Sequence, residues 1–255
     1  MWKYSTLKYI FWPIFIGVFL YSFIVESLGI WVFVGLILCW LSYIVFGVFR
    51  MEAGIFLTAV CRLPHVTKKN LILTFDDGPD PDHTPEILDI LKLHQAQAVF
   101  FCIGKNIQTF PEIVKRIVAE GHIVANHSFH HSNFIGSYST QKVVTEIQLT
   151  ENAIIDCIGE SLQLYRPPVG VTNPNIAKAI KKLNMTVLGW SVRSFDTVSS
   201  DKNELLRRIT STLKNGDIIL LHDTKPVTKD ILADFLLYST NKGFTFDINP
   251  VRAIK

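Results

Sequence analysis

The feature that most constrains the fold of this chain is a pair of long uncharged runs near its N-terminus. Seventeen uncharged residues separate Lys8 from Glu26, and 23 separate Glu26 from Arg50. At about 1.5 Å per helical residue, these runs would span roughly 25 Å and 34 Å, against a hydrocarbon core of about 30 Å. We therefore predict that residues 1–49 form a membrane anchor, a transmembrane helical hairpin that turns near residues 26–29.

The same apolar runs are also compatible with a signal peptide or with a single membrane crossing. A cleaved signal peptide would begin with basic residues, here Lys3 and Lys8, but no small-residue cleavage site follows and a second apolar run comes immediately. A topology in which only the second run crosses the membrane is also possible, because the first run is close to the minimum spanning length. In the hairpin, the lipid bilayer would contact residues 9–49.

The basic residues around the runs bear on the orientation in the cell membrane. They precede the first run and follow the second, and none lies between the two: Lys3, Lys8, Arg50, Arg62, Lys68 and Lys69. Positive residues beside short membrane segments tend to stay in the cytoplasm. An integral hairpin would therefore place the rest of the chain on the cytoplasmic face, whereas a single crossing would place it outside.

Beyond the anchor, the composition is that of a globular protein. We expect a connecting segment at residues 50–69 and a second domain at 70–255. The 49% share of hydrophobic residues excludes a disordered chain. The balance of 25 basic against 22 acidic residues argues against a nucleic-acid partner held by charge, and the four scattered cysteines predict free thiols.

From residue 70, short apolar runs alternate with segments of helical period, which predicts an α/β domain with a largely parallel sheet. Strands are expected at residues 71–75, 98–103, 123–125, 186–190, 218–221 and 244–248. Helices are expected between them: one capped by Thr84, and others at residues 111–120, 139–158, 176–183, 204–213 and 231–239. Polar residues follow several of the strands, where parallel α/β folds place their active sites.

Two adjacent carboxylates, Asp76 and Asp77, follow the first expected strand in the segment Thr-Phe-Asp-Asp-Gly-Pro. Carboxylates at the mouth of a buried strand repel each other unless a cation joins them. Neighbouring residues on a strand point to opposite faces, so the two would have different roles. An Asp-Gly pair alone more often makes only a turn.

His127 and His131 follow the strand expected at 123–125, and one helical turn would bring both imidazoles to one side. Two imidazoles and one carboxylate suit a hydrolytic zinc site or a site for another divalent metal. The spacing alone is weak evidence, and His130 could replace either partner.

Two further segments carry residues of interest. Arg166-Pro-Pro-Val-Gly begins with a cation that can pair with a carboxylate through two hydrogen bonds. His222 follows a strongly apolar strand and is a candidate general acid, with Asp196 as a partner that would hold it charged. Taken singly, a solvated arginine before a turn and a structural histidine would account for them as well.

Together, these segments resemble the polysaccharide deacetylase family, also called carbohydrate esterase family 4 or the NodB-homology domain. Residues 74–79 match its first motif in full, and His127-Ser128-x-x-His131 matches the second. Residues 166–170 match the third, with Val169 where the family usually has an aromatic residue, and Leu220-x-His222 matches the fifth. The resemblance covers about residues 70–248.

The resemblance implies a distorted (β/α) barrel of the polysaccharide deacetylase type behind the N-terminal hairpin. It also implies metal-dependent removal of N-acetyl groups from an amino-sugar glycan, namely peptidoglycan, a chitin-like oligosaccharide or a surface polysaccharide. The implied roles are a general base (Asp76) held by Arg166, a metal site (Asp77, His127, His131), a general acid (His222) paired with Asp196, an oxyanion-binding amide (Val169), an acetyl-pocket wall (Leu220) and a brace for the histidine loop (Ser128). Zinc is the expected metal, although such a ligand set also accepts cobalt, nickel or iron.

The fourth motif departs from the family, which often has Asp-x-x-Asp-Trp. Here Asp196 remains, but Arg193 replaces the first Asp and Thr197 replaces the Trp. One wall of the substrate groove must therefore differ, which leaves the substrate open. Two alternatives accompany the main hypothesis: a deacylase or deformylase of a sugar on a lipid carrier, and an inactive glycan-binding module of the same fold.

Overall fold

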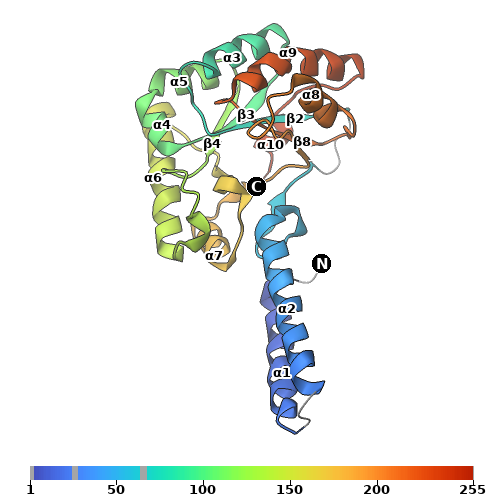
Figure 1. Ribbon diagram of the computed structural model, residues 1–255. Coiled ribbons are helices and arrows are strands. Elements are labelled where there is room, and N and C mark those ends of the chain that lie inside the picture. The colour runs from blue at the N-terminus through green and yellow to red at the C-terminus, as the bar shows by residue number, and fades with distance from the viewer. Residues whose placement is uncertain (1–2, 25–27, 64–67, 255) are drawn as a thin grey trace.

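The computed structural model describes residues 3–24, 28–63 and 68–254. Its first two helices, α1 (Tyr4–Ser22) and α2 (Leu28–Phe49), lie side by side and project from an α/β domain (Figure 1). Aromatic rings join them, and Phe11 stacks on Trp40 with ring centroids 4.1 Å apart. By length and composition both helices could cross a membrane. Part of the turn expected at residues 26–29 lies outside the described residues.

The helical hairpin is attached to the domain at the ends of both helices. At the start of α1, the Tyr4 amide donates a hydrogen bond to the Ile55 carbonyl, with an N···O distance of 2.9 Å. Near the end of α2, Thr172 donates through its hydroxyl to the Gly47 carbonyl at 2.7 Å and through its amide to the Val48 carbonyl at 3.0 Å. The first turn of α1 and the last turn of α2 therefore both lie next to the α/β domain.

The domain is built on a parallel sheet whose strand order is β1-β6-β5-β4-β3-β2-β8-β7. The strands are β1 (Ala59–Val60), β2 (Ile72–Asp76), β3 (Ala98–Cys102), β4 (Ile123–Asn126), β5 (Leu164–Tyr165), β6 (Thr186–Leu188), β7 (Val192–Arg193) and β8 (Ile218–His222). The sheet curls, but β1 and β7 remain its edges in the described part of the chain, so it forms a half-barrel. The predicted distorted (β/α) barrel is thereby confirmed.

Helices cover the outside of the half-barrel (Figure 1). They are α3 (Thr84–Leu93), α4 (Gly104–Thr109), α5 (Pro111–Ala119), α6 (Thr140–Ile158), α7 (Pro174–Leu183), α8 (Lys202–Thr210) and α9 (Pro226–Asn241). The short α10 (Asn249–Arg252) instead packs Val251 against the core that contains Ile72, and 3-10 turns lie at Met51–Ala53, Ile135–Ser137 and Pro168–Gly170. The helix predicted at 139–158 is confirmed with both of its ends. Ser139 caps α6 by accepting from the Lys142 amide, and Gly159 closes it with φ 83°.

Alternation along β2 decides which of its side chains reach the site. Leu73 and Phe75 join the core beneath the outer helices. Ile72 joins a second core inside the curl, and Thr74 and Asp76 share its face because strand side chains alternate with a period of two. The strand therefore delivers one carboxylate to the inside of the half-barrel at its carboxyl end.

The structure differs from the sequence predictions at several elements. Residues 244–248 form one bridge, Asn70 with Thr245, instead of a strand, because the Asn70 side chain bonds the backbone amide and carbonyl of Asp247. Within the predicted connecting segment 50–69, the strand β1 pairs with β6. Thr84 does not cap α3; its hydroxyl donates to the buried carboxylate of Asp223 at 2.6 Å.

Candidate functional site

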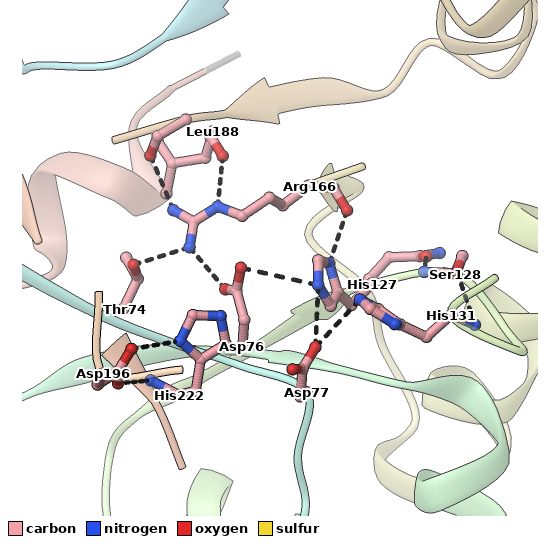
Figure 2. Close-up of polar contacts among 12 residues, drawn as sticks. Thr74, Asp76, Asp77, His127, Ser128, His131, Arg166, Leu188, Asp196 and His222 are labelled. Carbon is pink, nitrogen blue, oxygen red and sulfur yellow. Dashed lines mark hydrogen bonds and ion pairs between the residues drawn. The ribbon is translucent and has the colours of Figure 1, made fainter. Parts of the chain in front are cut away.

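The predicted site residues converge at the carboxyl ends of the strands (Figure 2). Asp76 ends β2 and lies beside His222 at the end of β8 in the sheet register. His127 follows β4, and Arg166 follows β5. Asp76, His127 and His222 border a cavity of about 240 Å³, and Arg166 is buried behind Asp76. The cavity is also lined by Asp77, His131, Asn133, Val169, Gly170, Trp190, Arg193, Thr197 and Leu220.

Asp77, His127 and His131 form a cluster with the geometry of a metal site. Oδ1 of Asp77 lies 3.1 Å from Nε2 of His131 and 3.4 Å from Nε2 of His127. The three candidate ligand atoms all lie within 4.8 Å of one another. Oδ1 of Asp77 is buried and accepts no hydrogen bond from the described residues, so a cation would satisfy it. The residues therefore fit a divalent metal ion.

The hydrogen bonding of His127 and the burial of His131 favour metal ligation by both imidazoles. Nδ1 of His127 donates to the Arg166 carbonyl at 2.8 Å, which leaves the Nε2 lone pair facing Asp77. Burial and the nearby charge of His127 lower the pKa of His131, which favours its neutral form. Burial alone would raise the pKa of Asp77, but the two imidazoles outweigh it and lower that pKa, so the group stays a carboxylate.

The histidines converge through a strained loop. The prediction that one helical turn aligns them is wrong, because residues 127–131 are not helical. Ser128 and His131 have φ of 64° and 49°, and Asp77 has φ of 77°. Such conformations cost of order 1–3 kcal/mol each and cluster at functional sites. The Ser128 hydroxyl accepts from the His131 amide at 3.2 Å, and the Ser128 amide donates to Asn126, so Ser128 braces the loop as predicted.

The structure also separates His131 from its neighbour His130. Nδ1 of His130 lies 2.9 Å from a carboxylate oxygen of Glu146 on α6, and the His130 amide donates to the other oxygen at 3.0 Å. His130 is therefore turned away from Asp77 and is not part of the ligand cluster.

Arg166 holds Asp76 from inside the half-barrel. The guanidinium is fully buried and donates through Nη1 to Oδ1 of Asp76 at 2.6 Å and to the Thr74 hydroxyl at 2.8 Å. Its remaining nitrogens donate to the carbonyls of Leu188 and Gly189 at 2.9 Å and 2.8 Å. A buried charge needs such complete pairing. One oxygen of Asp76 is thus committed to Arg166, while Oδ2 lies 3.7 Å from Nε2 of His127.

Asp196 and His222 form a second pair on the opposite wall. Nδ1 of His222 donates to Oδ1 of Asp196 at 2.8 Å, and the His222 amide donates to Oδ2 at 2.7 Å. The Thr228 hydroxyl on α9 donates to the same Oδ2 at 2.6 Å. Burial alone would lower the pKa of His222, but the hydrogen bond and charge of Asp196 outweigh it and raise that pKa. Asp196 therefore favours the protonated form of the imidazole and engages only one of its two ring nitrogens.

Sequence reasoning missed several residues of this site. Trp190 lines the cavity just after β6, and a side chain on Gly170 would collide with its ring. The sequence did contain a signal for Trp190, because this residue lies at the carboxyl end of an expected strand, as the candidate catalytic residues do. Thr228 gave no signal, since it lies on α9 and reaches Asp196 only through the tertiary fold. Val169 lines the cavity with φ of 60°.

Several known proteins are similar to this chain in sequence, and solved structures are similar to it in fold. The profile of the family described as Polysaccharide deacetylase matches residues 64–188. The peptidoglycan-N-acetylglucosamine deacetylase PgdA of Listeria monocytogenes is 33% identical over 195 residues, which are 75% of this chain. The chain spans 41% of the length of that relative.

Two further proteins are similar over most of their own length. A peptidoglycan-N-acetylglucosamine deacetylase of Bacillus cereus is 33% identical over 184 residues, covering 70% of this chain and 85% of the relative. The structure of the peptidoglycan deacetylase PdaC from Bacillus subtilis has a TM-score of 0.66 and 31% identity, and covers 71% of this chain and 87% of that one. With its motifs converging on one cavity, this chain belongs to the polysaccharide deacetylase family, carbohydrate esterase family 4.

Proposed function

We propose that this protein uses a divalent cation to hydrolyse N-acetyl groups on an amino-sugar glycan. The observation that carries the proposal is the single cavity on which a three-ligand cluster, a carboxylate held by Arg166 and the Asp196–His222 pair all converge. Amide hydrolysis needs these three elements together: an activated water, a base for its proton and an acid for the leaving amine.

Asp77, His127 and His131 are the proposed ligands, and we propose zinc as their metal. When bound, a divalent cation polarises the carbonyl of the acetamide and lowers the pKa of a water from 15.7 to about 7. The same donor set also suits cobalt, nickel or iron.

The two acid–base groups divide the proton transfers between them. Asp76 is the proposed base: Arg166 fixes one of its oxygens, which leaves Oδ2 to take the proton of the attacking water. His222 is the proposed acid: Asp196 fixes Nδ1, which leaves the proton on Nε2 for the departing amine nitrogen. Without that proton the amine is a poor leaving group.

Val169 and Leu220 are the proposed contacts of the acetyl group. Both line the cavity, and Leu220 is buried on β8 two residues before His222. The backbone amide of Val169 would donate to the oxyanion, which needs no aromatic side chain at that position. Leu220 would form the wall against the methyl group.

We further propose that residues 1–49 anchor the protein in a lipid bilayer. The helices α1 and α2 carry large apolar side chains that are mostly exposed, such as Tyr9 at 72% and Trp31 at 74%. An exposed apolar surface of this extent needs a partner, and lipid is the partner that fits two uncharged helices of membrane-spanning length.

The named relatives act on peptidoglycan, which makes peptidoglycan or its precursors the leading glycan. Deacylation or deformylation of a sugar on a lipid carrier is the second candidate, favoured by the closeness of the site to the end of α2. An inactive glycan-binding module is disfavoured, since the proposed ligands, base and acid are all present.

The test is release of acetate by the purified full-length protein in detergent. The substrates are N-acetylated glycan fragments, with and without a chelator and with metal added back. We expect acetate release that the chelator abolishes and added zinc restores. Release of formate or a longer acid from a lipid-linked sugar would favour the second candidate, and no product from any substrate would favour the binding module.

A further inference from the structure

A second cavity adjoins the proposed active site. Its volume is about 320 Å³, and it lies between residues 49–52, which include the end of α2, and the strand ends that carry Trp190 and Arg193. Both of these side chains also line the cavity that contains Asp77 and His222. The two cavities therefore share Trp190 and Arg193 in their walls, and a ligand that filled both would pass these two side chains.

Two arginines line this second cavity, and they differ in whether a carboxylate pairs with their charge. Arg50 forms an ion pair with Glu52 at 2.9 Å. The guanidinium of Arg193 lies over the rings of Phe195 and Trp190, with its carbon 4.7 Å and 6.0 Å from the centroids. Among the described residues, no carboxylate lies within ion-pair distance of Arg193. Its hydrogen-bond donors are thus available to a ligand.

The backbone beside Arg193 is held in an unfavourable conformation that supports this arrangement. Phe195 has φ of 65°, which is rare for a bulky residue and costs of order 1–3 kcal/mol. Its ring lies between Arg193 and Arg208, whose guanidinium carbon is 4.8 Å from the ring centroid. The strained residue therefore provides the surface on which the guanidinium of Arg193 rests beside both cavities.

We propose that the second cavity is a substrate subsite for an anionic group, a carboxylate or a phosphate, carried by the glycan next to its acetylated sugar, and that Arg193 binds this group. The inference rests on the proposed function and names the substrate class. A planar guanidinium with free donors binds carboxylate and phosphate through paired hydrogen bonds. The Asp that the family often has at this position would repel such a group, so the exchange reverses the preference.

The position of the subsite suggests two sources for the anion. Phe49 ends α2 and residues 50–52 follow it directly, so the subsite lies on the side of the domain that faces α2. A phosphate that links a saccharide to a membrane lipid would approach from that side. A carboxylate on the neighbouring sugar of a glycan chain offers the same chemistry without a lipid.

The experiment compares three acetylated substrates on the full-length protein in detergent. They are a neutral N-acetylglucosamine oligomer, a peptide-free glycan of similar length whose alternate sugars carry carboxylates, and the saccharide on a polyprenyl diphosphate. We expect Arg193→Gln to lower the ratio of kcat/KM for an anionic substrate over the neutral one about tenfold, through KM. The anionic substrate that is affected identifies the source.

Arg208→Gln is the matched control, because this arginine contacts the same ring but lines neither cavity. It should leave the ratio unchanged. An unchanged ratio in Arg193→Gln for both anionic substrates would overturn the subsite. If no substrate releases acetate, the proposed function fails, and calorimetric binding of the same substrates to the two variants tests the subsite alone: equal affinities for the anionic substrates would then refute it.

Discussion

At the scale of single residues, the proposed metal site depends on three side chains that follow two strands, β2 and β4. We predict that Asp77→Ala, His127→Ala and His131→Ala each abolish both metal retention and activity, because two remaining ligands leave the ion open to competing chelators. Elemental analysis of the purified variants measures the loss. His130→Ala is the matched control, since that imidazole bonds to Glu146. Full metal occupancy in His131→Ala would place the ion at a different site.

A second prediction separates the base from the ligand beside it. Asp76→Asn should keep its metal and lose turnover by about 10²–10⁴-fold, the usual range for a general base, because the amide can still accept from Arg166 but cannot take a proton. His222→Ala should behave in the same way. Activity and metal content are measured on one preparation. Losses below about tenfold in both variants would contradict these roles.

The pair of Asp196 and His222 predicts a pH dependence. As the proposed general acid, His222 must be protonated to act, and Asp196 raises its pKa above the ordinary 6.5. Asp196→Asn removes the largest contributions that raise this pKa, and only the weaker effects of the Asp76 and Asp77 charges then oppose burial. The pKa should therefore fall, and the alkaline limb of the kcat profile should move to lower pH. A group whose pKa is raised on folding stabilises the folded state fully below its unfolded pKa, here about 6.5, and this stabilisation is lost as the pH rises through the folded pKa. The difference in stability between the wild-type protein and Asp196→Asn should therefore shrink with rising pH. An unmoved alkaline limb would show that Asp196 does not control the acid.

A site residue could be predicted when it belongs to a short pattern along the sequence, and it could not be predicted when only the tertiary fold brings it to the site. Adjacent Asp76 and Asp77, and the spacing of His127 and His131, are local patterns, and the structure brings these side chains together. The backbone conformation that brings the two histidines together could not be predicted from their spacing. Residues with positive φ values replace the helical turn that the spacing suggested. Contacts made only by the tertiary fold, such as Thr228 with Asp196, leave no pattern along the chain.

At the scale of elements, the connection from β2 to α3 is tightly packed around Asp223. A methyl group on Gly78 would collide with the Asp223 carboxylate, which also accepts from Thr84. We predict that Gly78→Ala lowers the free energy of unfolding by about 1–3 kcal/mol, the usual range for overpacking. Chemical denaturation measures it.

Gly159→Ala is the comparison for that variant, because Gly159 has open space around it and its φ of 83° supplies only a backbone cost. In an Asp223→Ala background, Gly78→Ala should cost less, since the colliding group is gone. An equal cost in both backgrounds would mean that the collision with Asp223 is not the cause.

The elements themselves were predictable in proportion to their length. α6 carries a cap at Ser139, a stop at Gly159 and many apolar positions between them, so its ends were located. β5 and β7 have two residues each, too few to show a period, and both were missed. Residues 244–248 have the alternation of a strand, but the Asn70 side chain occupies the backbone groups that a neighbouring strand would need.

At the scale of the whole molecule, the hairpin limits which topologies are open. The Tyr4 amide bonds to the Ile55 carbonyl, so α1 begins where the anchor meets the domain. The 19 residues of α1 span about 28 Å and run beside α2 (Figure 1). In the proposed anchor the two helices therefore share one depth range, which favours two crossings, and we predict that the N-terminus and the domain lie on the same side of the membrane.

The charges then predict which side that is. Lys3, Lys8 and Arg50 lie at the domain end of the hairpin, and the segment between the apolar runs has no Lys or Arg. Since positive residues stay in the cytoplasm, we expect the domain to be cytoplasmic and its substrate to be a precursor or lipid-carrier saccharide at the inner leaflet. A fluorescent protein fused after Lys255 should fluoresce, and alkaline phosphatase there should be inactive. The same phosphatase placed after Glu26 is the control and should be active. Phosphatase activity after Lys255 would instead mean a single crossing with the domain outside, and would make mature envelope glycan the leading substrate.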